Sequence, residues 1–117
     1  MHKQEVAADL KCSRREAGLT GLDVAHLLEV DPARVSRLEN GHSLPSTREL
    51  CKLTLIYGKV PDHLLSRATC STAPELKERV ESLPPEPLGW EKRDQRLDTL
   101  NALAERLRDL TNGGHAA

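Results

Sequence analysis

The stretch that decides the fold is residues 20–41, TGLDVAHLLEVDPARVSRLENG. Thr20 followed three residues later by Asp23 has the spacing of a capping box, so the pattern predicts a helix that begins at residue 21. Apolar residues then recur at helical spacing and predict one buried face: Leu22, Val24, Ala25 and Leu28. The first half of the stretch is therefore predicted to be a short amphipathic helix.

A second short helix is predicted in the other half of the stretch. Asp31 is a carboxylate N-cap and Pro32 suits the first helical position. Asn40-Gly41 predicts the end of the helix, because both residues tolerate a left-handed conformation. Only residues 29–31 separate the two helices, so we expect the helices to cross at a steep angle.

The predicted second helix has two unlike faces. Val35 and Leu38 are expected to point inward. The outward residues are polar or small: Ala33, Arg34, Ser36 and Arg37. An arginine-bearing outer face on the second of two crossing helices is typical of a helix that enters a DNA major groove. The alternative is a small helical hairpin of an ordinary all-α domain, and two short apolar helices alone would favour it.

Further motifs extend this pattern on both sides of the stretch. They are Leu10, Arg14 and Arg15, Gly18-Leu19-Thr20, Val24-Ala25, Leu28, Val35 to Gly41, Pro45, Leu50, Leu53, Tyr57-Gly58, Val60 and Leu64-Leu65. With these motifs, from about residue 10 to residue 65, the chain resembles the phage-repressor-like helix-turn-helix family, the Cro/CI type that is also called XRE-like. The run from Ser36 to Gly41, S-R-L-E-N-G, is the most specific part of the resemblance.

The resemblance implies an all-α fold: a five-helix repressor-like helix-turn-helix domain followed by C-terminal helices. We expect the five helices near residues 4–17, 21–29, 32–39, 46–57 and 61–68. Ser46 with Glu49 is a capping box for the fourth helix. Gly58 ends that helix and Pro61 starts the fifth.

The candidate DNA-binding residues surround the second helix of the stretch: Thr20, Gly21, Pro32, Ala33, Arg34, Ser36, Arg37, Asn40, Gly41 and His42. Arg34 and Arg37 can each offer a bidentate fork to guanine or clamp a phosphate, and Ser36 can reach either kind of edge. Asn40 and the backbone at Gly41 are expected to meet phosphate.

The resemblance also concerns positions that need not touch a base. It implies that Arg14 and Glu39 form an internal ion pair that braces the recognition helix. The family usually has glutamine at the position of Gly21. Glycine has no side chain, so Gly21 can offer only its backbone N–H to a phosphate. It often has glycine where this chain has Glu29. There the turn either holds a left-handed glutamate, which costs about 1–2 kcal/mol, or takes another geometry.

The composition limits the number of domains and the size of the core that this chain can form. The 117 residues and 13.0 kDa fit one small domain plus an appendage. Hydrophobic residues make up 38% and Phe is absent, so the predicted core is aliphatic and modest, and dimerisation is one way to complete it. The sequence has no apolar run of about 18 residues and no signal-peptide pattern, so we expect a cytoplasmic protein.

The charge balance restricts how this chain could bind nucleic acid. The net charge of −1 argues mildly against non-specific affinity. Residues 1–68 carry ten Lys or Arg against nine Asp or Glu, and residues 69–117 carry seven against nine. A DNA-binding domain with this balance must collect its positive charge on one face. The candidates for that face are Arg34, Arg37, Lys11, Arg15 and His42.

The cysteines and histidines do not form a pattern that predicts a disulfide framework or a metal site. Cys12, Cys51 and Cys70 are an odd number without C-x-x-C spacing. We expect small, buried, reduced side chains, with a redox-sensing thiol as the alternative. The histidines are scattered along the chain, so we expect no metal site, and nothing in the sequence predicts a cofactor.

The C-terminal part changes in character. Residues 69–89 are predicted to hold a short helix that starts near Ser71 to Glu75, then a proline-rich connector. Residues 90–112 are predicted to form an amphipathic helix, with Asn112-Gly113-Gly114 as its stop. Its apolar residues are Trp90, Leu97, Leu100, Leu103, Ala104, Leu107 and Leu110. This face could dimerise with a second subunit or pack on its own; we favour the dimer.

Three functional hypotheses follow. The first is a homodimeric, sequence-specific transcriptional repressor that binds an inverted-repeat operator in double-stranded DNA, with residues 1–68 as the DNA-binding domain. The second is an antitoxin or anti-activator that acts mainly by binding another protein, with autoregulatory DNA binding. The third, an enzyme, has no support, because the sequence shows no nucleophile–base pair, phosphate loop or carboxylate cluster.

Overall fold

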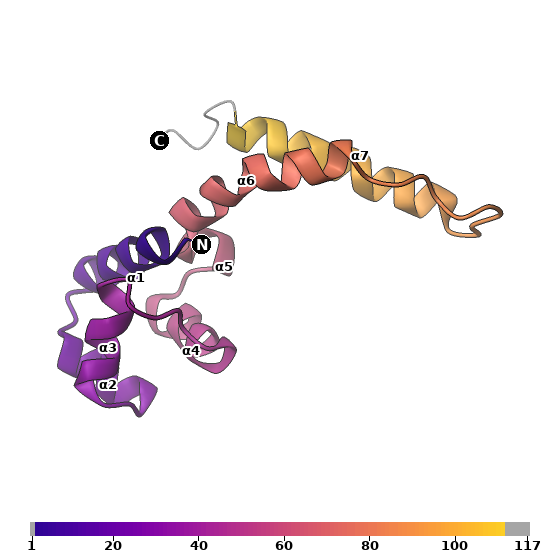
Figure 1. The fold of residues 1–117 in the computed structure, drawn as a ribbon. Helices are drawn as coiled ribbons and strands as arrows, with labels where there is room; N and C mark the ends of the chain where they lie inside the picture. The colour runs from indigo at the N-terminus through magenta and orange to yellow at the C-terminus, as the bar shows by residue number, and fades with distance from the viewer. Residues whose placement is uncertain (1, 112–117) are drawn as a thin grey trace. The chain divides into compact units, whose positions relative to one another are not determined.

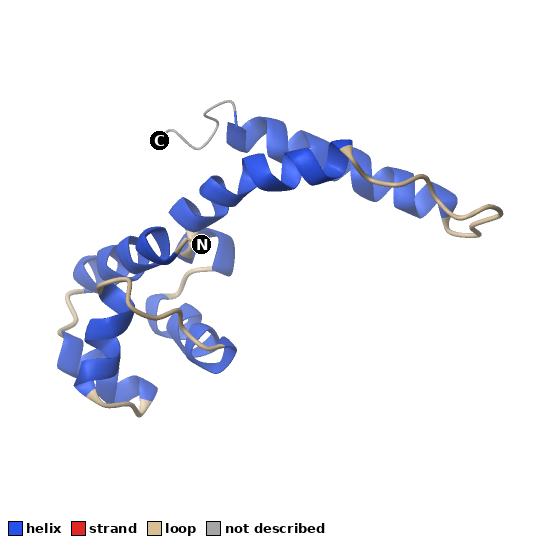
Figure 2. Cartoon of the chain, in the orientation of Figure 1, coloured by secondary structure: helices blue, strands red, loops and turns tan. Residues whose placement is uncertain are grey.

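The computed structural model describes residues 2–111. Within this range the chain forms seven helices and no strand (Figure 1, Figure 2). In chain order they are α1 (Lys3–Ala17), α2 (Gly21–Leu28), α3 (Pro32–Glu39), α4 (Thr47–Tyr57), α5 (Pro61–Leu64), α6 (Ser66–Glu81) and α7 (Arg93–Thr111). The predicted all-α class is confirmed, and the first four helices begin and end within one residue of their predicted bounds.

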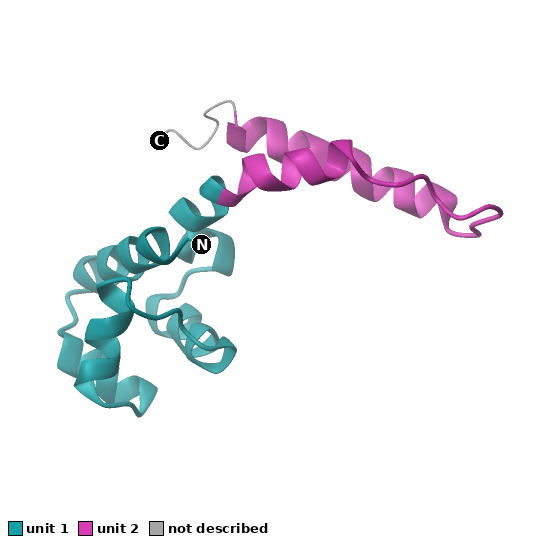
Figure 3. Cartoon of the chain, viewed as in Figure 1, with its two compact units in different colours: residues 1–71 teal, residues 72–117 magenta. Residues whose placement is uncertain are grey.

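The chain divides into two compact units, residues 1–71 and residues 72–117 (Figure 3). The first unit holds α1 to α5 and the start of α6, and the second holds the rest of α6 and α7. None of the described helices is long and apolar enough to cross a membrane. The predicted stop Asn112-Gly113-Gly114 lies outside the described residues.

The predicted helix starts are present in atomic detail. Thr20 Oγ1 accepts from the N–H of Asp23 at 3.1 Å, and the Asp23 carboxylate accepts from the N–H of Thr20 at 2.9 Å. Ser46 and Glu49 make the same two bonds at 3.1 and 2.8 Å. The Asp31 carboxylate caps α3. Each of these bonds occupies a backbone N–H that would otherwise lack a partner at the helix start.

The turn between α2 and α3 keeps its left-handed residue even without glycine. Glu29 has φ 59° and ψ 44°. Its N–H donates to His26 O at 3.1 Å, and the N–H of Val30 donates to Ala25 O at 3.0 Å. This pair of bonds is a Schellman motif, which closes the C-terminus of α2. Of the two alternatives for this turn, the strained glutamate is the one observed.

The core of the first unit is aliphatic, as predicted. Its buried members come from α1 to α6: Val6, Leu10, Val24, Ala25, Leu28, Val35, Leu38, Leu53, Leu64 and Ala68. Leu22 was predicted to join them but is 68% exposed, because it lies on the first turn of α2, on the side away from the core. Cys51, also predicted to be buried, is exposed, whereas Cys12 and Cys70 are half-buried.

The predicted fifth helix, 61–68, is wrong at its C-terminal end, because α5 and α6 are separate helices that meet at Leu65. The cause is Asp9 of α1, whose side chain is 2% exposed. Its carboxylate accepts from the N–H of Arg67 at 3.1 Å and of Ala68 at 3.3 Å, and from Arg67 Nη1 at 2.8 Å. These backbone N–H groups belong to the first turn of α6. Asp9 therefore caps α6 from a different helix and starts it there.

We expect Asp9→Ala to lower the free energy of unfolding of the first unit by about 2–3 kcal/mol. The substitution removes a helix cap and leaves buried N–H groups without an acceptor. Urea unfolding followed by circular dichroism measures the loss. Asp62→Ala, which removes an exposed carboxylate of α5, is the control and is expected to change stability by less than about 0.5 kcal/mol. Equal losses in the two variants would contradict the capping role.

In the second unit, the predicted helix start at Ser71 to Glu75 is wrong. Pro74 lies inside α6, which is already under way from its Asp9 cap. Proline removes one hydrogen bond to the carbonyl four residues earlier, that of Cys70. The helix nevertheless continues to Glu81.

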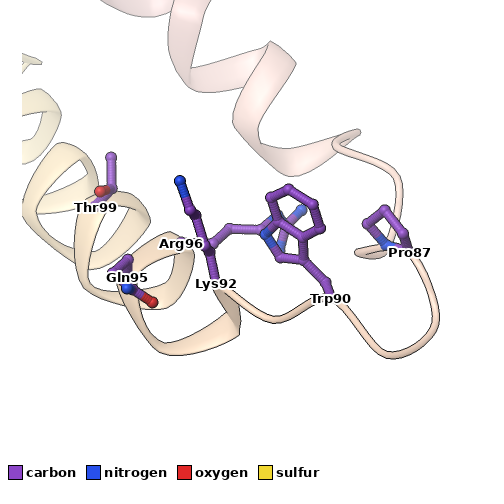
Figure 4. A pocket seen from close by; sticks show the side chains of 6 residues that line it. All are labelled: Pro87, Trp90, Lys92, Gln95, Arg96 and Thr99. Carbon is purple, nitrogen blue, oxygen red and sulfur yellow. The ribbon is translucent and has the colours of Figure 1, made fainter.

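The predicted helix 90–112 is wrong at its N-terminal end, because α7 begins at Arg93. A turn precedes it, in which the N–H of Trp90 donates to Pro87 O at 3.1 Å and Gly89 has φ 69°. Trp90 therefore lies on the connector between α6 and α7 and is 42% exposed. There it lines a hollow of about 450 Å³ together with Pro87, Lys92, Gln95, Arg96 and Thr99. Figure 4 shows these six side chains.

Within the second unit, α7 lies beside the second part of α6 (Figure 3). The two helices share a hollow lined by Lys77, Val80, Glu81, Ala104, Leu107 and Arg108. Leu107 is 5% exposed, and four of the predicted apolar residues are half-buried: Leu100, Leu103, Ala104 and Leu110. Leu97 is 55% exposed. Much of the apolar face of α7 is therefore covered within its own chain.

Candidate nucleic-acid interface

Helix α3 presents a narrow outer face. Val35 and Leu38 are buried at 4% and 2% exposure and fix the helix against the core. Ala33, Ser36 and Arg37 lie on the opposite side and are exposed. Among the described residues, the Arg37 side chain makes no hydrogen bond or ion pair. The outer face thus offers a methyl group, a hydroxyl and a guanidinium to a ligand.

Half of the predicted DNA-binding residues meet at one hollow of about 420 Å³. It is lined by Lys11, Arg14, Thr20, Gly21, Leu22, Pro32, Val35, Ser36, Glu39 and Asn40. The hollow lies where the N-terminus of α2 faces α3, and a helix N-terminus favours a negative group such as a phosphate. Asn40 Nδ2 donates to Ser36 Oγ at 3.1 Å, which orients both side chains at its edge.

The remaining candidates lie outside this hollow. Ala33, Arg37 and His42 are exposed, and Gly41 is half-buried with φ 78°. A Cβ atom at Gly41 would collide with the side-chain amide of Gln4. Glycine at the end of α3 is therefore favoured by its left-handed backbone conformation, whereas the Gln4 amide is the end of a flexible side chain that can move aside.

Arg34 makes contacts within the protein that the sequence did not predict. Its Nε donates to Glu49 Oε2 at 3.0 Å and its Nη2 donates to Glu49 Oε1 at 2.7 Å and to Leu44 O at 3.1 Å. The bidentate fork that was predicted for guanine or phosphate is thus occupied inside the protein. Sequence reasoning missed this contact because Glu49 was already assigned to a capping box, and the carboxylate serves both purposes.

The Arg34–Glu49 pair changes the acidity of the carboxyl group. The hydrogen bonds from Arg34 lower the pKa of Glu49 to about 2, with a smaller contribution from the N–H of Ser46, whereas burial opposes this shift. The side chain of Glu49 is only 12% exposed. Glu49 is therefore a carboxylate throughout the physiological range.

At the other end of α3, the structure brings Arg14 and Glu39 together. Arg14 Nε donates to both oxygens of the Glu39 carboxylate at 2.9 Å, and Arg14 Nη1 donates to Leu19 O at 3.0 Å. The two side chains are 19% and 10% exposed. Nearby, burial and the negative charge of Glu39 raise the pKa of Tyr57 to about 12. The geometry makes this pair a link between α1 and the end of α3.

The charges that are available at the surface are few. Arg15, Arg37 and His42 are exposed, and Lys11 is half-buried at the hollow. Over the described residues, no group of three or more His, Cys, Asp or Glu side chains is placed to hold a metal ion. The cationic side chains of Lys11, Arg15 and Arg37 can bind anions at this surface.

The comparisons with known proteins agree with this geometry. The model of a helix-turn-helix domain family matches residues 5–68, which is more than half of the chain. The chain belongs to the helix-turn-helix domain family. No curated protein and no solved structure matches it. Membership of the family indicates a DNA-binding regulator of transcription, with α2 and α3 as the two helices of the helix-turn-helix.

We expect Arg14→Ala to lower the free energy of unfolding of the helix-turn-helix unit by about 3 kcal/mol in the absence of DNA, because it leaves the largely buried carboxylate of Glu39 without its partner. Thermal and urea unfolding measure this loss. Arg15→Ala removes a neighbouring but exposed arginine and should leave stability nearly unchanged. A midpoint unchanged by Arg14→Ala would show that the pair does not brace the fold.

Glu49→Gln tests the second pair through pH. The lowered pKa means that the ionised carboxylate stabilises the fold above its ordinary pKa of 4.5, and that this stabilisation is lost as the pH falls from 4.5 to about 2. The stability difference between parent and variant should therefore be about 3 kcal/mol at pH 7 and shrink towards zero near pH 2. Glu16→Gln, at a carboxylate that is 60% exposed, is the control and should show a smaller change. A difference independent of pH would rule out this role for Glu49.

Proposed function

We propose that this protein is a sequence-specific transcriptional repressor of the Cro/CI type, XRE-like, that binds an inverted-repeat operator as a homodimer. The observation that carries the proposal is the outer face of α3. Of its two arginines, Arg34 is held by Glu49, whereas Arg37 is exposed and makes no side-chain hydrogen bond among the described residues. A single available guanidinium on a braced helix is suited to reading a base in the major groove.

The neighbouring groups divide into base-reading and phosphate-binding sets. Arg37 is assigned to the O6 and N7 atoms of guanine, Ala33 to the methyl group of thymine, and Ser36 to either kind of edge. The phosphate-binding set comprises Thr20, Gly21, Asn40, Gly41 and His42, at the N-terminus of α2 and the end of α3. Phosphate contacts fix the position of the helix on DNA, and base contacts give the sequence preference.

Two copies are needed for useful selectivity. One short recognition helix reads only a few base pairs, whereas two helices related by a two-fold axis read two half-sites about one helical turn apart. A protein of this size that occupies such a site excludes other proteins from the same DNA, which is why we assign repression. Its role is binding, and we propose no catalytic activity.

Arg37→Ala is the direct test of base reading. On the preferred site, obtained by selecting bound fragments from random DNA, we expect a loss of about 1–3 kcal/mol in binding free energy and relaxed preference at one base pair of each half-site. Fluorescence anisotropy at several salt concentrations measures both the affinity and the salt dependence. Arg48→Ala, at an exposed arginine of α4, is the matched control and should keep the preference.

The alternative outcomes separate the roles of Arg37. Uniform weakening on all DNA sequences, with a shallower dependence on salt, would assign Arg37 to phosphate. No loss on any DNA would remove α3 from the interface and would contradict the proposed function.

A further inference from the structure

One large apolar side chain is exposed at the surface that is assigned to DNA. Leu22 is 68% exposed on the first turn of α2. It lines the hollow of about 420 Å³ where the start of α2 faces α3, which we call the α2–α3 hollow. A single exposed leucine is common on protein surfaces, so what matters is the chemistry of the groups that lie around it.

The α2–α3 hollow has an apolar wall beside Leu22. Pro32 and Val35 of α3 line it too, and Pro32 is exposed. Gly21 has no side chain, and a Cβ atom added there would meet nothing within 4 Å. The space next to Leu22 is therefore open to a ligand.

A hydrogen-bond donor lies on the same side of α3 as Pro32. Pro32, Ser36 and Asn40 follow one another at intervals of four residues and so lie along one side of the helix. Ser36 Oγ accepts from Asn40 Nδ2 at 3.1 Å. Among the described residues the Ser36 hydroxyl donates to no group, so its hydrogen is available to a ligand. The hollow thus combines an apolar wall with a donor.

The charges at the α2–α3 hollow are compatible with DNA. Among the residues that line it, Glu39 is the one carboxylate, and Arg14 donates to both of its oxygens at 2.9 Å. Lys11 also lines the hollow and makes no ion pair among the described residues. Its positive charge favours the phosphate of a nucleotide whose base lies in the hollow.

We propose that the α2–α3 hollow reads a thymine, whose 5-methyl group packs against Leu22 and Pro32 and whose O4 atom accepts from the Ser36 hydroxyl. Thymine presents a methyl group beside an acceptor in the major groove, whereas cytosine presents an amino donor and no methyl group. The inference rests on the DNA-binding function proposed above. It assigns Leu22, which belongs to α2, a part in the sequence preference, and it narrows the contact of Ser36 to an acceptor.

Replacing thymine by deoxyuridine tests the methyl contact, because the two bases differ only by that methyl group. Each thymine of the selected operator is replaced in turn, and fluorescence anisotropy measures the affinity. At one thymine of a half-site the parent should lose about fourfold in affinity, as expected for burial of one CH₂-sized group. Leu22→Ala should bind the thymine operator more weakly, and its ratio of thymine to deoxyuridine affinity at that position should be close to one.

Two further variants control for folding and for the loss of any exposed leucine. Leu22→Met keeps an apolar side chain of similar volume and should keep the fourfold ratio. Leu27→Ala removes a leucine of α2 that is 48% exposed and does not line the hollow, and it should keep the ratio as well. Circular dichroism checks that every variant has the helix content of the parent.

The O4 contact is tested at the same position with 5-methylcytosine, which keeps the methyl group but carries an amino group in place of O4. The parent should prefer thymine about threefold or more, the range of one hydrogen bond. Ser36→Ala should reduce this preference and leave the ratio of thymine to deoxyuridine affinity unchanged. A preference that Ser36→Ala does not change would overturn the O4 contact.

The outcomes distinguish this inference from the proposed function. An operator without a thymine at which deoxyuridine weakens the parent would overturn the inference and leave the proposed function standing. The same holds if Leu22→Ala keeps the effect of deoxyuridine at every thymine. A parent that binds no DNA sequence selectively would overturn the proposed function, and the inference with it.

Discussion

The short helix α3 is held by an ion pair at each of its ends, and the rest of the helix-turn-helix depends on this arrangement. At eight residues, α3 is too short to persist alone in water. Val35 and Leu38 attach its inner side to the core. Arg14–Glu39 joins its end to α1, and Arg34–Glu49 joins its first turns to α4. The helix is therefore fixed from both sides.

This bracing has an electrostatic consequence. Both ion pairs neutralise arginines that would otherwise contribute to a positive surface, so the attraction for phosphate must come from a smaller set of groups. Lys11, at the hollow beside α3, and the exposed Arg15 and Arg37 are cations that make no ion pair among the described residues. A weak field lowers affinity for arbitrary DNA more than affinity for a matched site, because base contacts do not depend on net charge. The near-neutral chain is thus consistent with selective rather than indiscriminate binding.

Local signals in the sequence were sufficient for the elements of the helix-turn-helix. Capping boxes, the Asp31–Pro32 start and the glycines at helix ends act over a few residues, so the spacing alone predicts them. Among the contacts between distant segments, the family resemblance implied Arg14–Glu39, whereas two others were not predicted. Asp9 caps a helix that begins more than fifty residues later, and Glu49 serves its own helix and Arg34 together. The position of Pro74 inside α6 follows from the first of these, because the helix begins upstream of the point where proline would start one.

The two aromatic residues of the chain lie in different compact units. The sequence contains one tryptophan and one tyrosine, with no phenylalanine. Trp90 belongs to the second compact unit and Tyr57 to the first, where its hydroxyl is buried without a hydrogen bond among the described residues. Each unit therefore contains its own natural chromophore. Indole fluorescence follows the opening of one unit and tyrosine absorbance follows the other, so the protein reports without labels whether its two parts unfold together or in sequence.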